Sequence, residues 1–227
     1  MNLIEARGVG KLYFDTDPPT VAIRGADLVV KAGEFVSIMG PSGSGKSTLL
    51  HILGLLDKPT EGEYLFAHRQ VSTLSDKELA SLRNEKIGFV FQSFNLLPKT
   101  SVLQNVLLPL GYSQVPEADW MPRAKAVLEA VGLSHRLGHE TSELSGGEKQ
   151  RTAIARTFVT QPEIIFADEP TGNLDSQSGE TVLKLFEKFN AEGKTVILIT
   201  HDEKVARFAR RVIRIYDGKI IGDEVLI

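Results

Sequence analysis

The stretch Gly40–Thr48 has the residue types and the spacing that bind a nucleotide polyphosphate. It matches the phosphate-loop pattern G-x-x-x-x-G-K-[ST] at every fixed position. Its glycines let backbone N–H groups turn inward, Lys46 can reach the β- and γ-phosphates, and the Ser47 hydroxyl can ligate Mg²⁺. We expect a nucleoside triphosphate and Mg²⁺ to bind through Gly40, Pro41, Ser42, Gly43, Ser44, Gly45, Lys46, Ser47 and Thr48.

Four more polar residues directly follow apolar runs that we predict to be buried strands. These residues are Gln92, Asp168, Glu169 and His201. Sheets of parallel strands bind their ligands at the carboxyl ends of the strands. Because each of the four side chains stands at such an end, we expect them to converge where the phosphates bind.

Asp168 and Glu169 are expected to have different tasks. Consecutive strand residues point to opposite faces, so two adjacent carboxylates do not share one role. The division that fits has Asp168 holding Mg²⁺ through water, while Glu169 orients and polarises the attacking water. The structural alternative is a helix cap beside a surface acid. It is disfavoured because buried charge is costly unless it is paired or bound to a metal.

The segment Ser145, Gly146, Gly147 and Glu148 has the S-x-x-E spacing of a capping box. A glycine inside a helix is about 0.8–1 kcal/mol less favourable than alanine, so two in succession need a reason beyond capping. Bare backbone N–H groups at a helix N-terminus can bind phosphate. Since the phosphate loop already holds one side of a triphosphate, a second such helix end suggests a phosphate shared with another copy of the chain.

The composition excludes several classes of protein. The chain has 227 residues, of which 42% are hydrophobic and 24% charged, as in ordinary globular proteins. A net charge of −3 gives no electrostatic case for a nucleic-acid partner. The absence of cysteine excludes disulfides and thiolate metal sites. The sequence shows neither a signal-peptide pattern nor an apolar run near the ~20 residues that span a bilayer, so we expect a chain that is soluble by itself.

Strands and helices alternate around the phosphate loop. Strands are expected at Leu3–Val9, Ala26–Val30, Phe35–Met39, Glu63–Phe66, Ile87–Phe91, Glu163–Glu169, Lys194–Thr200, Val212–Tyr216 and Lys219–Ile221. Helices are expected at Ser47–Leu53, from Ser75 to about Asn84, at Ser101–Leu110, at Pro116–Val131, after Arg151 to about Thr160, and after Asp175 to about Ala191. This order predicts an α/β fold with a mainly parallel sheet covered on both faces.

The chain is expected to form a single domain, residues 1–227, with one insertion. Helices interrupt the strands from about residue 75 to 132, or as far as 160, and predict an inserted helical subdomain. Within it, one apolar stripe at helical spacing is expected to be core: Met121, Ala124, Val127, Leu128 and Val131.

These motifs together resemble the ATP-binding cassette (ABC) ATPases, the nucleotide-hydrolysing subunits of ABC transporters, over essentially the whole chain. The resemblance implies a P-loop NTPase core with an N-terminal antiparallel β subdomain. It also implies roles for individual residues: Gln92 as the Q-loop glutamine near both metal and reacting groups, Leu144–Glu148 as the signature, Asp168 as the magnesium aspartate, Glu169 as the catalytic glutamate, Asn173–Asp175 as the dimer-contacting D-loop, and His201 as the switch histidine.

Two positions bear on details of this resemblance. Tyr13 matches the aromatic residue that stacks on adenine, although an aromatic residue before a loop more often packs in a core. Position 148 is Glu, whereas the commonest form of the signature has Gln. The variant is an accepted one, so it affects only the details of the closed interface.

The mechanism implied by the resemblance is a head-to-tail homodimer. ATP would lie between the phosphate loop of one copy and Ser145–Gly147 of the other, with Lys46, Mg²⁺ and His201 stabilising the transferred phosphoryl group. Closing of the dimer would drive the membrane subunit of an ABC transporter. Such a chain would be cytoplasmic, peripheral on the inner face of the cell membrane.

Three segments narrow the resemblance to the macrolide-export and lipoprotein-release branch: Glu34–Gly40, Phe91–Pro98 and Ala167–Asp175. Peptide-resistance exporters and cell-division ATPases share much of them. Three alternatives stay open: the ATPase of an importer, a soluble ABC ATPase of DNA repair or translation, and a non-hydrolysing switch. Glu169 and His201 argue against the switch, and one cassette without cysteine argues against the repair class.

The segment Ser93–Leu110 is expected to contact the membrane subunit. Phe94, Leu96 and Leu97 are apolar within a predicted loop, and an exposed apolar patch marks an interface. The alternative is that these side chains fold back onto the helical subdomain.

Overall fold

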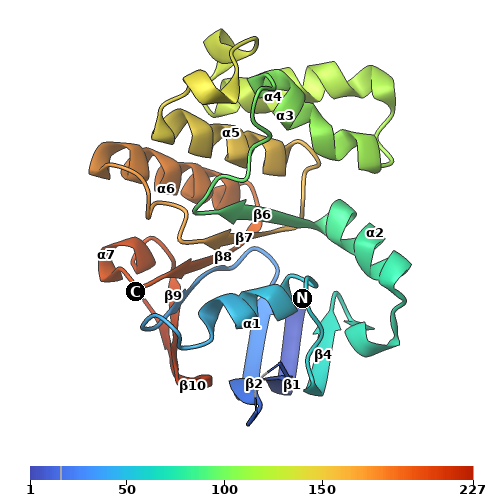
Figure 1. Cartoon of the computed structure of the whole chain (residues 1–227), viewed down its shortest axis with the longest axis vertical. Helices are drawn as coiled ribbons and strands as arrows, with labels where there is room; N and C mark the ends of the chain where they lie inside the picture. The colour runs from blue at the N-terminus through green and yellow to red at the C-terminus, as the bar shows by residue number, and fades with distance from the viewer. Residues whose placement is uncertain (16, 227) are drawn as a thin grey trace.

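The computed structural model describes residues 1–15 and 17–226. The strands within these residues form two β-sheets (Figure 1). One sheet has the order β2-β1-β4-β5, from β1 (Asn2–Tyr13), β2 (Thr20–Lys31), β4 (Glu61–Phe66) and β5 (Arg69–Gln70). The other has the order β10-β9-β3-β8-β7-β6, from β3 (Phe35–Met39), β6 (Ile87–Phe91), β7 (Ile164–Asp168), β8 (Thr195–Thr200), β9 (Arg211–Tyr216) and β10 (Lys219–Val225).

Strand direction differs between the two sheets. All strand pairs of the smaller sheet are antiparallel. In the larger sheet the pairs from β9 through β6 are parallel, and β10 pairs antiparallel with β9. The predictions of a mainly parallel core sheet and of an antiparallel N-terminal sheet are therefore confirmed.

Helices cover both faces of the six-stranded sheet (Figure 1). They are α1 (Lys46–Leu53), α2 (Asp76–Lys86), α3 (Val102–Leu107), α4 (Trp120–Ala130), α5 (Gly146–Phe158), α6 (Ser176–Ala191) and α7 (Glu203–Ala206). Helix α1 and the smaller sheet lie on one face, whereas α6 lies on the other, with α3, α4 and α5 on that same side. Within residues 1–15 and 17–226, the helices are too short or too polar to cross a membrane.

The central strands are apolar on both sides because they separate two hydrophobic cores. In β8, Ile197 and Ile199 pack with α1 and the smaller sheet, whereas Val196 and Leu198 pack with α3 to α6. This alternation follows the two-residue repeat of a strand. Burial on both faces holds the sheet rigid and fixes the ends of the strands at which the predicted site residues stand.

The helical part departs from the prediction in three places. The helix expected over Pro116–Val131 begins only at Trp120, and Met121 in its first turn is 43% exposed, so its assignment to the core was wrong. The helix expected over Ser101–Leu110 ends at Leu107 and continues as a 3₁₀ turn, η2 (Leu108–Tyr112), which contains Pro109, a residue without an N–H for the helix ladder. Helix α7 was not predicted.

Candidate active site

A cavity of about 670 Å³ lies at the carboxyl ends of the parallel strands. The structure brings into its lining most of the phosphate loop together with all four strand-end residues. The lining residues are Thr20, Val21, Ala22, Pro41, Ser42, Gly43, Gly45, Lys46, Ser47, Thr48, Gln92, Asp168, Glu169 and His201. Gly40 and Ser44 lie within the loop rather than on the cavity surface, and Ser44 is 4% exposed.

The phosphate loop wraps around its own lysine. Lys46 is the first residue of α1, is 8% exposed, and donates from its ammonium group to the carbonyl oxygens of Gly40 at 2.8 Å and Pro41 at 2.7 Å. Gly43 and Gly45 have φ values of +78° and +100°, which residues with a Cβ rarely adopt. The loop therefore forms a cradle with Lys46 held at its centre and the N-terminus of α1 at its base.

The turn between β9 and β10 supports this loop from behind. The N–H of Gly218 donates to the Ser44 carbonyl at 2.9 Å, and the Gly218 carbonyl accepts from the Arg24 N–H at 2.8 Å. The turn thus fastens the phosphate loop to β2. The sequence predicted both strands that flank this turn but not the contact, because nothing in the local pattern links residues so far apart along the chain.

Ser47 and Asp168 meet at the edge of the cavity. The Ser47 hydroxyl donates to Asp168 Oδ2 at 3.2 Å. Burial raises the pKa of the Asp168 carboxyl, while the hydrogen bond from Ser47 opposes that shift. Among the described residues no three His, Asp or Glu side chains cluster as a metal site would require. Two neighbouring oxygen ligands suit Mg²⁺, which takes most of its remaining ligands from water and phosphate.

Glu169 turns towards His201 because it stands just beyond the strand. The sequence predicted a strand through Glu169, but β7 ends at Asp168, and Glu169 has a φ of 45°. Its N–H donates to the Ile199 carbonyl at 3.0 Å, which fixes this left-handed backbone. His201 Nδ1 lies 2.7 Å from Glu169 Oε1. The carboxylate is only 19% exposed and the imidazole 71%, so the pair points into the open cavity.

Gln92 is tied to the turn that precedes α6. Its Nε2 donates to Asn173 Oδ1 at 3.2 Å, and Asn173 Nδ2 donates back to the Gln92 carbonyl at 3.1 Å. Asp175, further along the same turn, caps α6 by accepting from the Ser178 N–H at 2.9 Å. Asp175 is not among the lining residues of the cavity.

The Ser145–Glu148 segment forms the capping box expected from its spacing and does not line the cavity. The Glu148 N–H donates to Ser145 Oγ at 3.3 Å, and Glu148 Oε2 accepts from the Ser145 N–H at 2.9 Å. The hydrogen bonds that the Ser145 N–H and hydroxyl donate to this carboxylate, together with the Arg136 guanidinium, lower the pKa of Glu148 to about 2. Gly147 packs against Ser178 so closely that a Cβ there would lie 2.8 Å from its hydroxyl oxygen.

Tyr13 also lies outside the lining of the cavity. Its hydroxyl donates to Asp57 Oδ2 at 3.2 Å, and the Lys11 ammonium lies 5.1 Å from its ring centroid. The cavity wall nearest to this strand consists instead of residues 20–22 of β2, which sequence reasoning did not single out.

The family model described as "ABC transporter" matches residues 23–172. The chain belongs to the ABC transporter family. It is an ABC-type ATPase cassette, as the sequence predicted.

Relatives of this ABC cassette include both fused and single-cassette proteins. It is 50% identical over 99% of its length to the macrolide export ATP-binding/permease protein MacB of Bdellovibrio bacteriovorus, but it spans only 34% of that protein. It is 50% identical over 98% of its length to an "Uncharacterized ABC transporter ATP-binding protein" of Thermotoga maritima, of which it covers 95%.

A solved relative agrees closely in fold with this ABC cassette. The dimeric structure of a post-hydrolysis state of the ATP-binding cassette MJ0796, bound to ADP and Pi, matches with a TM-score of 0.90 and 44% identity. The match covers 99% of each chain. The ABC ATPase fold predicted from the motifs is therefore confirmed.

Proposed function

We propose that this ATPase cassette hydrolyses ATP with Mg²⁺ in the cavity described above and so powers a membrane transporter. The observation that carries the proposal is the meeting of Lys46, Ser47, Asp168, Glu169 and His201 around one cavity. The branch proposed is that of the macrolide and lipoprotein exporters, because of the three sequence segments and the likeness to MacB.

Each residue has a separate task in this proposal. Lys46 and the loop amides hold the β- and γ-phosphates. Ser47 and Asp168 would hold Mg²⁺, with Gln92 at its edge, and the metal when bound neutralises charge on the phosphates.

Glu169 is proposed to orient a water for in-line attack on the γ-phosphorus. The oxygen of that water forms the new bond to the γ-phosphorus, and one of the water's protons passes to Glu169. The bond from the γ-phosphorus to the β–γ bridging oxygen breaks, which gives ADP and phosphate. His201 lies 2.7 Å from Glu169 and is proposed to stabilise the transferred phosphoryl group.

The site is proposed to be completed by a second copy. Ser145, Gly146 and Gly147 present a helix N-terminus but do not line the cavity of their own chain. In a head-to-tail homodimer they would face the γ-phosphate held by the other copy. The Asn173–Asp175 turn lies between Gly146 and Gln92 and would form part of the same interface. The dimeric state of the MJ0796 relative supports this arrangement.

The proposed site is tested by Glu169→Gln. This change keeps shape and hydrogen bonding but removes the base, and loss of a positioned base lowers a rate by about 10²–10⁴-fold. ATP binding should persist because Lys46 and Ser47 are untouched. We expect the variant to accumulate as an ATP-dependent dimer in size-exclusion chromatography with light scattering, while phosphate release nearly stops.

Lys46→Ala is the matched control, because it should lose nucleotide binding and stay monomeric. Near-normal turnover in Glu169→Gln would contradict the role of Glu169. An inactive, ATP-loaded variant that stays monomeric would leave that role standing but contradict the shared site.

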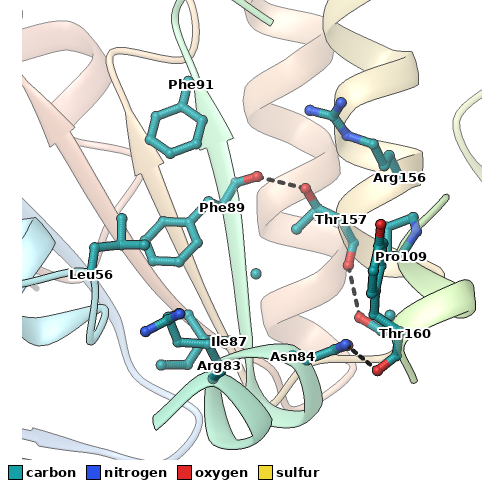
Figure 2. Close-up of a pocket in the computed structure, with 13 residues that line it drawn as sticks. Leu56, Arg83, Asn84, Ile87, Phe89, Phe91, Pro109, Arg156, Thr157 and Thr160 are labelled. Carbon is teal, nitrogen blue, oxygen red and sulfur yellow. Dashed lines mark hydrogen bonds between the residues drawn. The ribbon is translucent and has the colours of Figure 1, made fainter. Parts of the chain in front are cut away.

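The membrane partner is proposed to dock at a second cavity of about 400 Å³ (Figure 2). Phe89 and Phe91 of β6 form one wall and Thr157 of α5 faces them. At its rim Tyr112 is 78% exposed, and on the neighbouring Ser93–Leu110 segment Leu97 is 44% exposed. Exposed apolar side chains beside a concave surface are typical of a docking site. Through such a partner the chain would be cytoplasmic and peripheral on the inner face of the membrane.

The domain organisation is proposed on the same basis. The chain would act as one cassette domain, residues 1–227, in which a helical subdomain from about residue 75 to 160 is inserted into the P-loop core. Helices α3, α4 and α5 share a hydrophobic core with one face of the sheet, so the insertion is packed against the core rather than hinged freely from it.

A further inference from the structure

Helix α5 carries a carboxylate where the second copy's phosphate is proposed to bind. Glu148 lies in the first turn of α5, and its Oε2 accepts from both the N–H and the hydroxyl of Ser145, each at 2.9 Å. For the isolated helix this acid is favourable, because negative charge at an N-terminus stabilises the dipole. For an incoming phosphate it is a competitor, since it adds a like charge and occupies the donors of Ser145.

Glu148 keeps its negative charge at neutral pH. The Ser145 backbone N–H is the largest cause that holds the pKa of Glu148 down, to about 2. A neighbouring cation is therefore needed to neutralise it.

Arg136 supplies that cation from outside the signature segment. It ends the 3₁₀ turn η4 (Ser134–Arg136), and its Nε donates to Glu148 Oε1 at 2.9 Å. The two side chains are only 33% and 14% exposed, so solvent screens the ion pair less than it would a surface pair. Arg136 takes the carboxylate oxygen Oε1, whereas Ser145 takes Oε2. The capping box and the ion pair therefore coexist.

We propose that Arg136 is a positioning residue that neutralises Glu148 and so keeps the N-terminus of α5 able to bind the phosphate held by a second copy. The proposal rests on the proposed function above, since it assigns Arg136 to the shared site. It also accounts for the use of Glu at position 148: the acid caps the helix, and Arg136 removes its electrostatic disadvantage.

A second capping box in the chain has the same parts without the phosphate-binding glycines. Ser75 caps α2, Glu78 closes the box, and Arg69 donates to Glu78 Oε1 at 3.3 Å. Positions 76 and 77 are Asp and Lys, where α5 has two glycines. The Arg69 pair is therefore a matched control for removing an arginine from a capping box.

The test measures ATP-dependent dimerisation in the Glu169→Gln background. We expect Arg136→Gln to raise the dimer dissociation constant about tenfold, because an uncompensated carboxylate then faces the phosphate. Adding Glu148→Gln should restore it to within about twofold, because no charge is left to compensate. Raising the salt concentration from about 50 to about 500 mM should reduce the difference in dimer dissociation constant between Arg136→Gln and its parent, since added salt shortens the screening length. Arg69→Gln should leave the dimer dissociation constant unchanged. The nucleotide affinity of the monomer should be equal in all variants.

Several outcomes would overturn the proposal. One is an unchanged dimer in Arg136→Gln, and another is a defect that Glu148→Gln does not relieve, since a merely structural arginine would not be rescued by removing its partner. If Arg136→Gln folds poorly, Arg136→Lys becomes the test, because it keeps the positive charge. The proposal then requires Arg136→Lys to dimerise like its parent. A Glu169→Gln parent that never dimerises with ATP would contradict the shared site itself. This outcome is seen in the parent alone and can be distinguished from any effect of the Arg136 substitutions.

Discussion

The contact between Glu169 and His201 depends on one backbone angle. At a φ of 45° Glu169 leaves the direction of β7, and this brings its carboxylate within 2.7 Å of His201. Such a conformation costs a non-glycine residue about 1–3 kcal/mol and persists only where the surroundings impose it. Here the N–H bond to Ile199 of the neighbouring strand imposes it. Strain at this position is consistent with a catalytic task for Glu169.

We predict that Tyr13 stacks on adenine although it does not line the cavity. Stacking acts alike on ground and transition states, so Tyr13→Ala should raise KM for ATP about 5–30-fold with little change in kcat. Tyr13→Phe keeps the ring and loses only the hydroxyl bond to Asp57, so it should behave like the parent. Steady-state kinetics over a range of ATP concentrations measures both constants.

The neighbouring Phe14 is the control for this prediction. It is 72% exposed, and Phe14→Ala should leave KM unchanged. If Tyr13→Ala kept a normal KM but lost thermal stability, the ring would be a packing element held by Lys11 and Asp57. The bond to Asp57 could not be predicted from the sequence, because it joins residues 44 apart, one in a strand and one in a loop.

At the scale of elements, the β9–β10 hairpin acts as a support for the phosphate loop. Gly218 has a φ of +73°, and a Cβ there would lie 2.8 Å from the Ala22 carbonyl oxygen. Gly218→Ala must therefore shift the turn, weaken its bond to the Ser44 carbonyl and loosen the loop. We expect ADP affinity, measured by calorimetry, to fall about tenfold.

Gly222 in the same hairpin provides the control. The atoms nearest to a Cβ at this position would be side-chain atoms of Arg214, at 3.7–3.9 Å, which is ordinary contact. Gly222→Ala should therefore keep ADP affinity and the thermal midpoint. Unchanged ADP affinity in Gly218→Ala, with the thermal midpoint lowered, would show that the turn stabilises the fold without shaping the loop.

The sequence predicted the structure best where residues close together in the chain determine the local structure by themselves. The capping box at Ser145 follows from serine and glutamate at a fixed spacing and formed as expected. The same spacing forms a second capping box at Ser75, at the start of the helix predicted there. Helix α7 was missed because its four residues are too few to show a helical repeat. The stripe of apolar residues placed Ala124 and Leu128 correctly, but Met121 lies in the first turn of α4, where packing partners end.

At the scale of the whole molecule, one segment connects the two cavities. Gln92 lines the first cavity, and the chain then passes through Phe94 and Asn95 to the exposed Leu97. Arg156 of α5 donates to the Phe94 carbonyl at 3.0 Å and to the Asn95 carbonyl at 2.6 Å, and its side chain also lines the second cavity (Figure 2). A partner bound at the second cavity would therefore press on a segment that leads directly to Gln92.

The proposed docking at the second cavity is tested by placing charge on Tyr112, which lines the cavity, and on Leu97 of the Ser93–Leu110 segment. In the double variant Leu97→Glu/Tyr112→Glu, we expect the share of the chain that sediments with membranes containing its transporter subunit to fall about tenfold. Two buried carboxylates would oppose docking. Basal ATP hydrolysis and the thermal midpoint should stay unchanged, because neither side chain lines the first cavity or is buried in the core.

Ile221→Glu is the control for this surface, because Ile221 is 65% exposed but lies on β10, outside the second cavity. It should keep membrane association. Equal loss in both variants would mean that added charge, rather than the cavity, prevents docking. Loss of stability and of basal hydrolysis in the double variant would support the alternative that the Ser93–Leu110 segment folds back onto the helical subdomain. A stable, active chain that no longer sediments with its partner can result only if these side chains face the partner rather than the core.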